Sequence, residues 1–105
     1  MLLVGDRAQY EVLLPAASTV VSVYLTGPRG TASVAREYNY PHAEDADGAS
    51  LVRTTELRYV FTTPRFLQVG YFDLELLTDF GTDTIAQVRT QDVVSSALKV
   101  DLGTP

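Results

Sequence analysis

The stretch Gly70–Thr90, which reads GYFDLELLTDFGTDTIAQVRT, decides the fold. Its first half alternates an apolar row of side chains with a mostly polar row: Phe72, Leu74, Leu76 and Thr78 against Tyr71, Asp73, Glu75 and Leu77. Successive residues of a β-strand point to opposite faces of a sheet, so this period of two predicts a strand with one buried face. Turn residues follow at Asp79–Asp83, and a second alternating run covers Thr84–Thr90. We therefore predict a long antiparallel hairpin.

Shorter runs of the same kind fill most of the remaining chain. They are Ala8–Leu14, Val20–Thr26, Thr31–Tyr40, Leu51–Thr54, Leu57–Thr62 and a last candidate strand, Val93–Leu102. Gly27–Gly30 is predicted to be a turn, because proline fixes one φ and glycine permits positive φ. We expect Thr63–Val69 to cross between sheets and Pro41–Ser50, the longest polar interruption, to form a mobile surface loop. Short strands at this spacing predict an all-β sandwich of two sheets.

The length of the chain and the inward rows of its strands define the predicted domain and its core. A chain of 105 residues has room for one domain, residues 1–105, with a core over 4–90 and a C-terminal extension or extra strand over 91–105. The predicted core residues are Tyr10, Val12, Val21, Val23, Leu25, Tyr59, Phe61, Phe72, Leu74 and Leu76.

The composition excludes several classes of protein. The chain has no cysteine, so neither a disulfide framework nor a zinc–thiolate site is available. It carries 13 acidic and eight basic residues, a net charge of −5, and the basic residues are scattered, which disfavours nucleic acid and anionic membranes as partners. No apolar stretch approaches the ~20 residues of a membrane span. The first residues lack the basic segment of a signal peptide, so we expect synthesis and folding in a cytosol.

The sequence offers little catalytic chemistry. Its one histidine, His42, lies beside a polar loop, and a set of His42, Asp45 and Ser50 would rest on loop residues that are poorly preorganised for nucleophilic catalysis. Asp73 and Glu75 share one strand face, where two carboxylates are tolerated if they are exposed. We therefore predict that the protein is not an enzyme and has no catalytic residues.

The segment Glu44–Gly48 is the one candidate for a metal site. Oxygen donors alternate before a glycine, as in a calcium loop, with Asp45 and Asp47 as the candidate ligands. A complete EF-hand loop also needs a glutamate at its twelfth position, and none occurs in that register. We expect a plain acidic loop with no metal and no cofactor, and calcium at Asp45 and Asp47 is the alternative.

Aromatic residues cluster in two connections. Tyr38, Tyr40 and His42 carry three rings within five residues, and Arg65 and Phe66 lie in the later connection. Tyrosine, arginine and phenylalanine are enriched at the centres of protein interfaces, which makes these residues candidates for partner binding. The same residue types also fill sandwich cores, and they build the platforms on which sugars stack.

The order of elements resembles that of the immunoglobulin-like sandwiches of phage tail and baseplate proteins. The resemblance covers roughly Val4–Thr90 and rests on strands and turns: Val4-Gly5-Asp6 before Tyr10–Leu14, the strand Val21–Thr26 closed by Gly27–Gly30, then Leu57–Thr63 and Gly70–Leu76. It implies an immunoglobulin-like antiparallel sandwich of about seven to eight strands. The acidic Pro41–Ser50 is longer than this pattern leads us to expect. The Gly70–Thr90 hairpin also resembles the last two strands of polycystin-type repeats.

The resemblance implies a structural role in a phage virion, as a capsid decoration, neck or tail attachment module made in the host cytoplasm. We expect contacts with other virion proteins, several copies in a homo-oligomer, and no binding to nucleic acid or membrane. The predicted partner-binding residues are Tyr38, Tyr40, His42, Arg65, Phe66, Leu98, Val100 and Leu102. The last three alternate in the C-terminal segment, which is a candidate to add a strand to a neighbour's sheet. The alternative function is a carbohydrate-binding or adhesin module that uses the aromatic rings between Tyr38 and His42.

Overall fold

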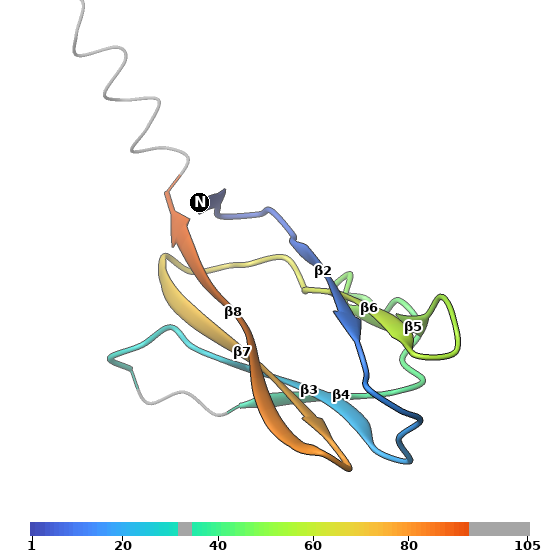
Figure 1. Ribbon diagram of the computed structural model, residues 1–105. Helices are drawn as coiled ribbons and strands as arrows, with labels where there is room; N and C mark the ends of the chain where they lie inside the picture. The colour runs from blue at the N-terminus through green and yellow to red at the C-terminus, as the bar shows by residue number, and fades with distance from the viewer. Residues whose placement is uncertain (32–34, 93–105) are drawn as a thin grey trace, which may run out of the picture.

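The computed structural model describes residues 1–31 and 35–92, and all regular structure within them is β-strand (Figure 1). The eight strands are β1 (Leu2–Leu3), β2 (Gln9–Leu13), β3 (Val21–Thr26), β4 (Arg36–Asn39), β5 (Ser50–Arg53), β6 (Arg58–Thr62), β7 (Gly70–Thr78) and β8 (Gly81–Gln91). The part of the chain described here contains no helix long and apolar enough to cross a bilayer.

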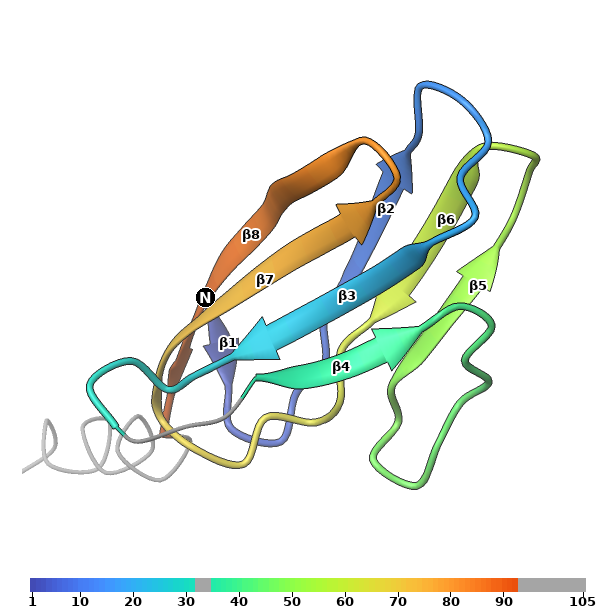
Figure 2. The ribbon, with the colours of Figure 1, turned by 90° about the horizontal axis from the view of Figure 1, so that it is seen from below.

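The strands form two sheets, which confirms the predicted all-β architecture of two layers. One sheet has the strand order β1-β8-β7-β3-β4 and the other has the order β2-β6-β5. Figure 2 shows β8, β7, β3 and β4 side by side across one layer, with β2, β6 and β5 in the layer behind. Neighbouring strands are antiparallel except β1, which runs parallel to β8. β1 has only two residues, so it is too short to show the alternation of side chains from which a strand is predicted.

The β7–β8 hairpin confirms the strongest prediction, with two corrections. The ladder pairs Thr78 with Gly81, so the turn consists of Asp79 and Phe80 alone and the predicted five-residue turn was too long. The backbone N–H of Phe80 donates to Thr78 Oγ1 (3.1 Å), which closes the turn locally. The register also shifts between Leu74 and Glu75, whose partners are Ala86 and Thr84, so Ile85 is an extra residue in β8. Such a bulge re-aims side chains and increases the local twist of a sheet.

The core lies between the inward faces of the two sheets. Its buried apolar residues are Leu14, Val21, Val23, Leu25, Tyr38, Ala49, Leu51, Tyr59, Phe61, Phe66, Phe72, Leu74, Leu76 and Val88. Every predicted core residue except Tyr10 and Val12 is among them. These two are partly buried and pack against the core, because β2 is the edge strand of its sheet and the sandwich is open on that side.

The connection between β6 and β7 contributes a residue to the core. Thr63–Val69 crosses between the sheets as predicted, and Phe66 within it is buried against Phe72, with ring centroids 4.8 Å apart. The backbone N–H of Phe66 donates to Asp6 O (3.1 Å), and that of Gly5 donates to Phe66 O (2.7 Å). The crossing is therefore fixed to the segment that joins β1 to β2.

The remaining strand predictions hold with shorter bounds or lie outside the described residues. Within the predicted strand Thr31–Tyr40, the described residues form β4, which ends at Asn39, two residues before Pro41, and residues 32–34 lie outside the described part. The short edge strand predicted at Leu51–Thr54 is present as β5. The last predicted strand, Val93–Leu102, falls outside the described residues.

Candidate interaction surface

Three residues from separate segments meet on the outer face of the larger sheet. Tyr71 projects from β7, and Arg89 lies directly opposite it on β8. Arg29, in the turn after β3, approaches the same ring from another segment. The guanidinium carbons lie 5.9 Å (Arg29) and 5.5 Å (Arg89) from the ring centroid, which is within the range of cation–π attraction. We call Arg29, Tyr71 and Arg89 the tyrosine–arginine patch.

Hydrogen bonds fix Arg29 in this patch. Its backbone N–H donates to Tyr71 O (2.8 Å). Its guanidinium meets the carboxylate of Asp73 in a two-point contact, with Nε 2.9 Å from Oδ2 and Nη2 on Oδ1. The hydrogen bond from Arg29 lowers the pKa of Asp73 from its ordinary value. Bidentate pairs of this kind restrict the orientation of the guanidinium, so the patch is held before any partner arrives.

Glycine makes the close approach of the turn to β7 possible. A Cβ on Gly70, whose φ is +145°, would lie 2.7 Å from the Cβ of Pro28. A Cβ on Gly27 would lie 2.5 Å from the ring of Phe72. The turn therefore packs directly on the first residues of β7, and Arg29 reaches the face of Tyr71 from there.

Exposed aliphatic side chains precede the patch along the chain. Leu67 and Val69 have 79% and 53% of their surface exposed, and Tyr71 has 46%. Single exposed apolar residues are common, but an aromatic ring flanked by arginines and aliphatic side chains has the composition of an interface centre. This part of the molecule is the candidate interaction surface.

A hollow of about 310 Å³ adjoins this surface. Arg36, Arg65 and Leu67 are among the residues that line it, together with the rings of Phe66 and Phe72. Within residues 1–31 and 35–92, neither Arg36 nor Arg65 forms an ion pair. The two guanidinium groups beside aromatic rings suit a carboxylate side chain of a protein partner, which planar arginine binds in a bidentate manner.

Two of the predicted partner-binding residues are core residues instead. Tyr38 has 6% of its surface exposed and Phe66 has 1%. Tyr38 points inward from β4, opposite Val23, and its ring lies 5.3 Å from that of Phe61. Burying these large rings removes their apolar area from water, which stabilises the fold. The predicted aromatic residues are therefore split between the core and the surface. Partner binding by Tyr38 and by Phe66 stays a prediction.

The other predicted partner-binding residues differ in their exposure. Tyr40 has 37% of its surface exposed, and its ring packs edge-on against Tyr59 at 5.1 Å. Arg65 is exposed and lines the hollow described above. His42 is half-buried, and its backbone pairs with Leu51. Partner binding by these residues stays a prediction. Leu98, Val100 and Leu102 lie outside the described residues.

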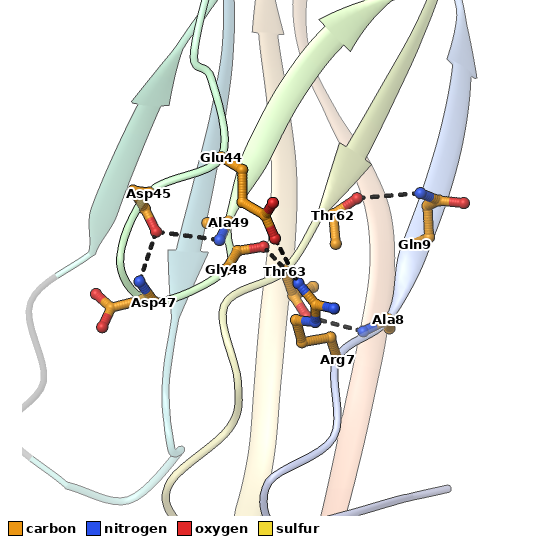
Figure 3. A network of polar contacts seen from close by, with 10 residues as sticks. All are labelled: Arg7, Ala8, Gln9, Glu44, Asp45, Asp47, Gly48, Ala49, Thr62 and Thr63. Atoms are coloured by element: carbon orange, nitrogen blue, oxygen red, sulfur yellow. Dashed lines mark hydrogen bonds and ion pairs between the residues drawn. The ribbon is translucent and has the colours of Figure 1, made fainter.

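Asp45 organises the loop between β4 and β5. Its Oδ2 lies 2.8 Å from His42 Nε2. Its Oδ1 accepts the backbone N–H groups of Asp47 (2.8 Å) and Ala49 (3.1 Å), as Figure 3 shows. The hydrogen bond from His42, followed by those from Ala49 and Asp47, lowers the pKa of the Asp45 carboxyl group. Ser50 makes no hydrogen bond to His42 or Asp45 in the described part of the chain, so the three do not form a catalytic chain.

The two candidate calcium ligands do not converge. The Asp45 carboxylate turns into the loop, whereas the Asp47 carboxylate points away from it (Figure 3). No group of three or more histidine and carboxylate side chains suited to a metal occurs in residues 1–31 and 35–92. Within the loop, the carboxylate of Asp45 accepts the hydrogen bonds that fix its shape.

The loop is also tied to the start of β2. Arg7 Nη1 donates to Glu44 Oε1 (2.9 Å) and approaches Gly48 O (3.3 Å), as drawn in Figure 3. Gly48 is buried, and Ala49 is fully buried in the core. A Cβ on Gly48, at φ +86°, would lie 2.8 Å from Arg7 Nη1. The predicted surface loop is exposed or half-buried over residues 41–47, and Gly48 and Ala49 return beneath the arginine to reach β5.

Replacing Asp45 with alanine is expected to lower the free energy of unfolding by about 1–2 kcal/mol, because two backbone donors and His42 lose their acceptor. Asp47→Ala, in the same loop, should cost less than about 0.5 kcal/mol. Urea unfolding of both variants and of the native chain measures the difference. Equal effects of the two substitutions would contradict the role given to Asp45.

The lowered pKa of Asp45 also predicts a pH dependence. A carboxyl group whose pKa is lower in the folded state stabilises the fold above its unfolded pKa of about 3.9 and loses this contribution as the pH falls through the folded value. The stability gap between the native chain and Asp45→Asn should therefore be full at pH 6 and shrink at pH values below about 4. A gap that widens on acidification would show that the sign is wrong.

Comparison with known proteins does not assign this chain to a family. No protein-family model matches the chain, and no curated protein matches it. The molecule is thus defined by its own features: a two-sheet β-sandwich with a preorganised tyrosine–arginine patch on one outer face.

The sequence analysis did not predict this patch, because Arg29, Tyr71 and Arg89 belong to three segments. The available signals were Tyr71 in the outward row of its strand and Arg29 within a predicted turn.

Proposed function

We propose that this protein is a non-enzymatic structural component of a phage virion, a capsid decoration, neck or tail attachment module that acts through protein–protein contacts. Its fold in this proposal is an immunoglobulin-like sandwich. The tyrosine–arginine patch carries the proposal, and the sequence resemblance to phage tail and baseplate domains supplies the virion context.

The strand order supports the immunoglobulin-like topology. Immunoglobulin sandwiches join a sheet that contains strands B, E and D to one that contains G, F and C, with C′ added in variable-type domains. If β2 to β8 are read as B, C, C′, D, E, F and G, the sheet β2-β6-β5 becomes B-E-D. The other sheet becomes G-F-C-C′, with the two-residue β1 as a short first strand parallel to G.

The composition and rigidity of the patch support a role in protein contact. Tyr71 combines a large exposed ring with two arginines, and these residue types carry a disproportionate share of interface energy. Arg29 is already ordered by Asp73 and by the backbone of Tyr71. Little side-chain entropy remains to be lost on binding, which favours association. The hollow with Arg36 and Arg65 extends the surface toward an acidic partner side chain.

A labelling experiment tests the virion proposal. Antibodies against this protein should label particles purified from a culture of the phage that encodes the chain, at a fixed position seen by immunogold electron microscopy. A polymerase of the same phage serves as the control and should leave no label. Purified particles that lack the protein, or a coding sequence outside any phage or prophage genome, would overturn the proposal.

Tyr71→Ala is expected to weaken incorporation into particles at least tenfold while leaving the fold intact. The ring is half-exposed, so its loss costs little core packing but removes the group that both arginines contact. Phe80→Ala is the matched control, because Phe80 is also half-exposed but lies in the β7–β8 turn. Quantitative blotting of purified particles compares the two. A larger effect at Phe80 would assign the contact to the turn instead.

A further inference from the structure

A second surface lies on the open side of the sandwich, where the edge strands of the two sheets face each other. A hollow of about 320 Å³ is lined by Tyr10, Val12 and Leu13 of β2 and by Asp83 and Ile85 of β8, with Leu76 of β7 beneath. Most of these side chains are apolar, and Leu13 has 67% of its surface exposed. We call this hollow the edge groove.

Both strands that flank the edge groove have a free edge. β2 pairs with β6 and with no other strand among the described residues. On the side away from β7, β8 pairs with β1 through Thr90 and Gln91 only, so its residues from Gly81 to Arg89 have no strand beside them there within the described part of the chain. Free edges present alternate N–H and C=O groups that pair readily with an added strand.

The bulge in β8 faces this groove. Because Ile85 is the extra residue, it and Ala86 are both half-buried and pack against the core. Natural sheets use bulges to protect edges, but here the re-aimed side chain adds an apolar surface to the groove. The groove therefore offers both backbone groups and an apolar floor, the two elements that bind an added strand.

The C-terminal segment of the chain has the properties of such a strand. Leu98, Val100 and Leu102 alternate with Lys99 and Asp101, so one face of an extended segment would be wholly apolar. The five residues from 98 to 102 match the length of β2. Lys99, the sole lysine, would face a rim that carries two carboxylates: that of Glu11, which pairs with Arg58 (3.0 Å), and that of Asp83, which forms no ion pair among the described residues.

We propose that the edge groove binds residues 98–102 of a second copy of this chain as an added β-strand. This inference rests on the proposed function, since it gives the protein–protein contacts a mechanism of self-assembly. In each copy β1 pairs with β8 at Thr90 and Gln91 only, so the part of β8 that lines the groove is open to an added strand. The proposed occupant is the segment of a second copy, and binding of the segment to its own groove is an outcome of the test.

The test measures the molar mass of the full chain by light scattering over a concentration series. The native chain should associate, and Val100→Asp in the C-terminal segment should weaken association at least tenfold. Ile85→Asp in the groove should do the same. Leu13→Asp provides a second groove variant that keeps the fold, because Leu13 is exposed in the monomer. Val20→Asp is the matched control, since Val20 has 41% of its surface exposed but lies outside both the edge groove and the candidate interaction surface.

Mixing the variants distinguishes strand exchange between copies from association through a different surface. A Leu13→Asp chain has an intact C-terminal segment, and a Val100→Asp chain has an intact groove, so an equimolar mixture should regain association that neither shows alone. A monomeric native chain, an unchanged mixture, or a larger loss in Val20→Asp than in Leu13→Asp would each overturn the inference. A monomer whose stability falls in both variants would indicate binding to its own groove and would also overturn it. If the native chain is monomeric but antibodies against it still label virions, the proposed function stands and only this inference fails.

Discussion

Phe61→Ala is expected to lower the free energy of unfolding by about 3–5 kcal/mol, which is a large share of the ~5–15 kcal/mol that stabilises a typical domain. Phe61 lies on β6, is fully buried and packs against the ring of Tyr38 at 5.3 Å. Its truncation removes the apolar area of a whole ring and leaves a cavity between two sheets that cannot close completely. Urea unfolding followed by circular dichroism gives the change directly.

Phe80→Ala is the control for this substitution. Phe80 has 52% of its surface exposed in the β7–β8 turn, so the same chemical change should alter the free energy of unfolding by less than about 1 kcal/mol. The comparison isolates burial, because the residue type and the atoms removed are identical. If the two variants had equal stability, the position of the core between the sheets would be wrong.

Gly27→Ala is expected to cost about 2–5 kcal/mol, from backbone strain at a positive φ together with overpacking. The φ of Gly27 is +148°, and an added Cβ would lie 2.5 Å from Phe72 Cδ2 and 2.9 Å from Phe72 Cα. A ring can rotate slightly, but the Cα of Phe72 cannot move without disturbing the pairing of this residue with Val88 of β8. Thermal and urea unfolding measure the loss.

Gly30→Ala separates the two contributions. Gly30 lies in the same turn at φ +84°, yet an added Cβ would meet no atom within 4 Å. Its cost should therefore be limited to the conformational strain of about 1–2 kcal/mol. A Gly30 variant as unstable as the Gly27 variant would contradict the close packing of the turn on Phe72.

The Gly27 substitution links stability to the candidate interaction surface. The turn that Gly27 begins carries Arg29, whose backbone and side chain are bound to Tyr71 and Asp73. If the turn is pushed away from β7, Arg29 leaves the ring of Tyr71. We expect Gly27→Ala to weaken partner binding beyond its effect on folding, whereas Gly30→Ala should affect binding little.

Local patterns predicted the strands well because each pattern reflects one physical requirement. The alternation in Gly70–Thr78 follows from one face of a strand meeting the core and the other meeting water, and the structure confirms it residue by residue. The same argument correctly assigned the inward faces of β3 and β6. It failed where a strand is too short for a period, as in β1, or where Gly81–Asp83 looked like a turn but continues the ladder.

The candidate sites were harder to predict, because they depend on which distant residues meet. Tyr38 and Phe66 were assigned to the surface from residue type, yet both are buried, since residue type does not say which aromatic faces inward. The patch of Arg29, Tyr71 and Arg89 depends on the pairing of β7 with β8 and on a turn that packs against them. The edge groove depends on a one-residue bulge in β8, and this bulge leaves no sign in the alternation of apolar and polar residues along the sequence.

By itself, then, the sequence determined that this protein is all-β, where its described strands other than β1 lie and which faces most of them bury, because these follow from local alternation and turn chemistry. The tertiary structure alone decided the order of the strands, the division of the aromatic residues between core and surface, and the two surfaces on which the functional proposals rest. These features arise from contacts between residues far apart in the chain, such as Asp6 with Phe66 and Arg29 with Asp73. The free energies of such contacts depend on packing in three dimensions, so they cannot be predicted from the local alternation of residues.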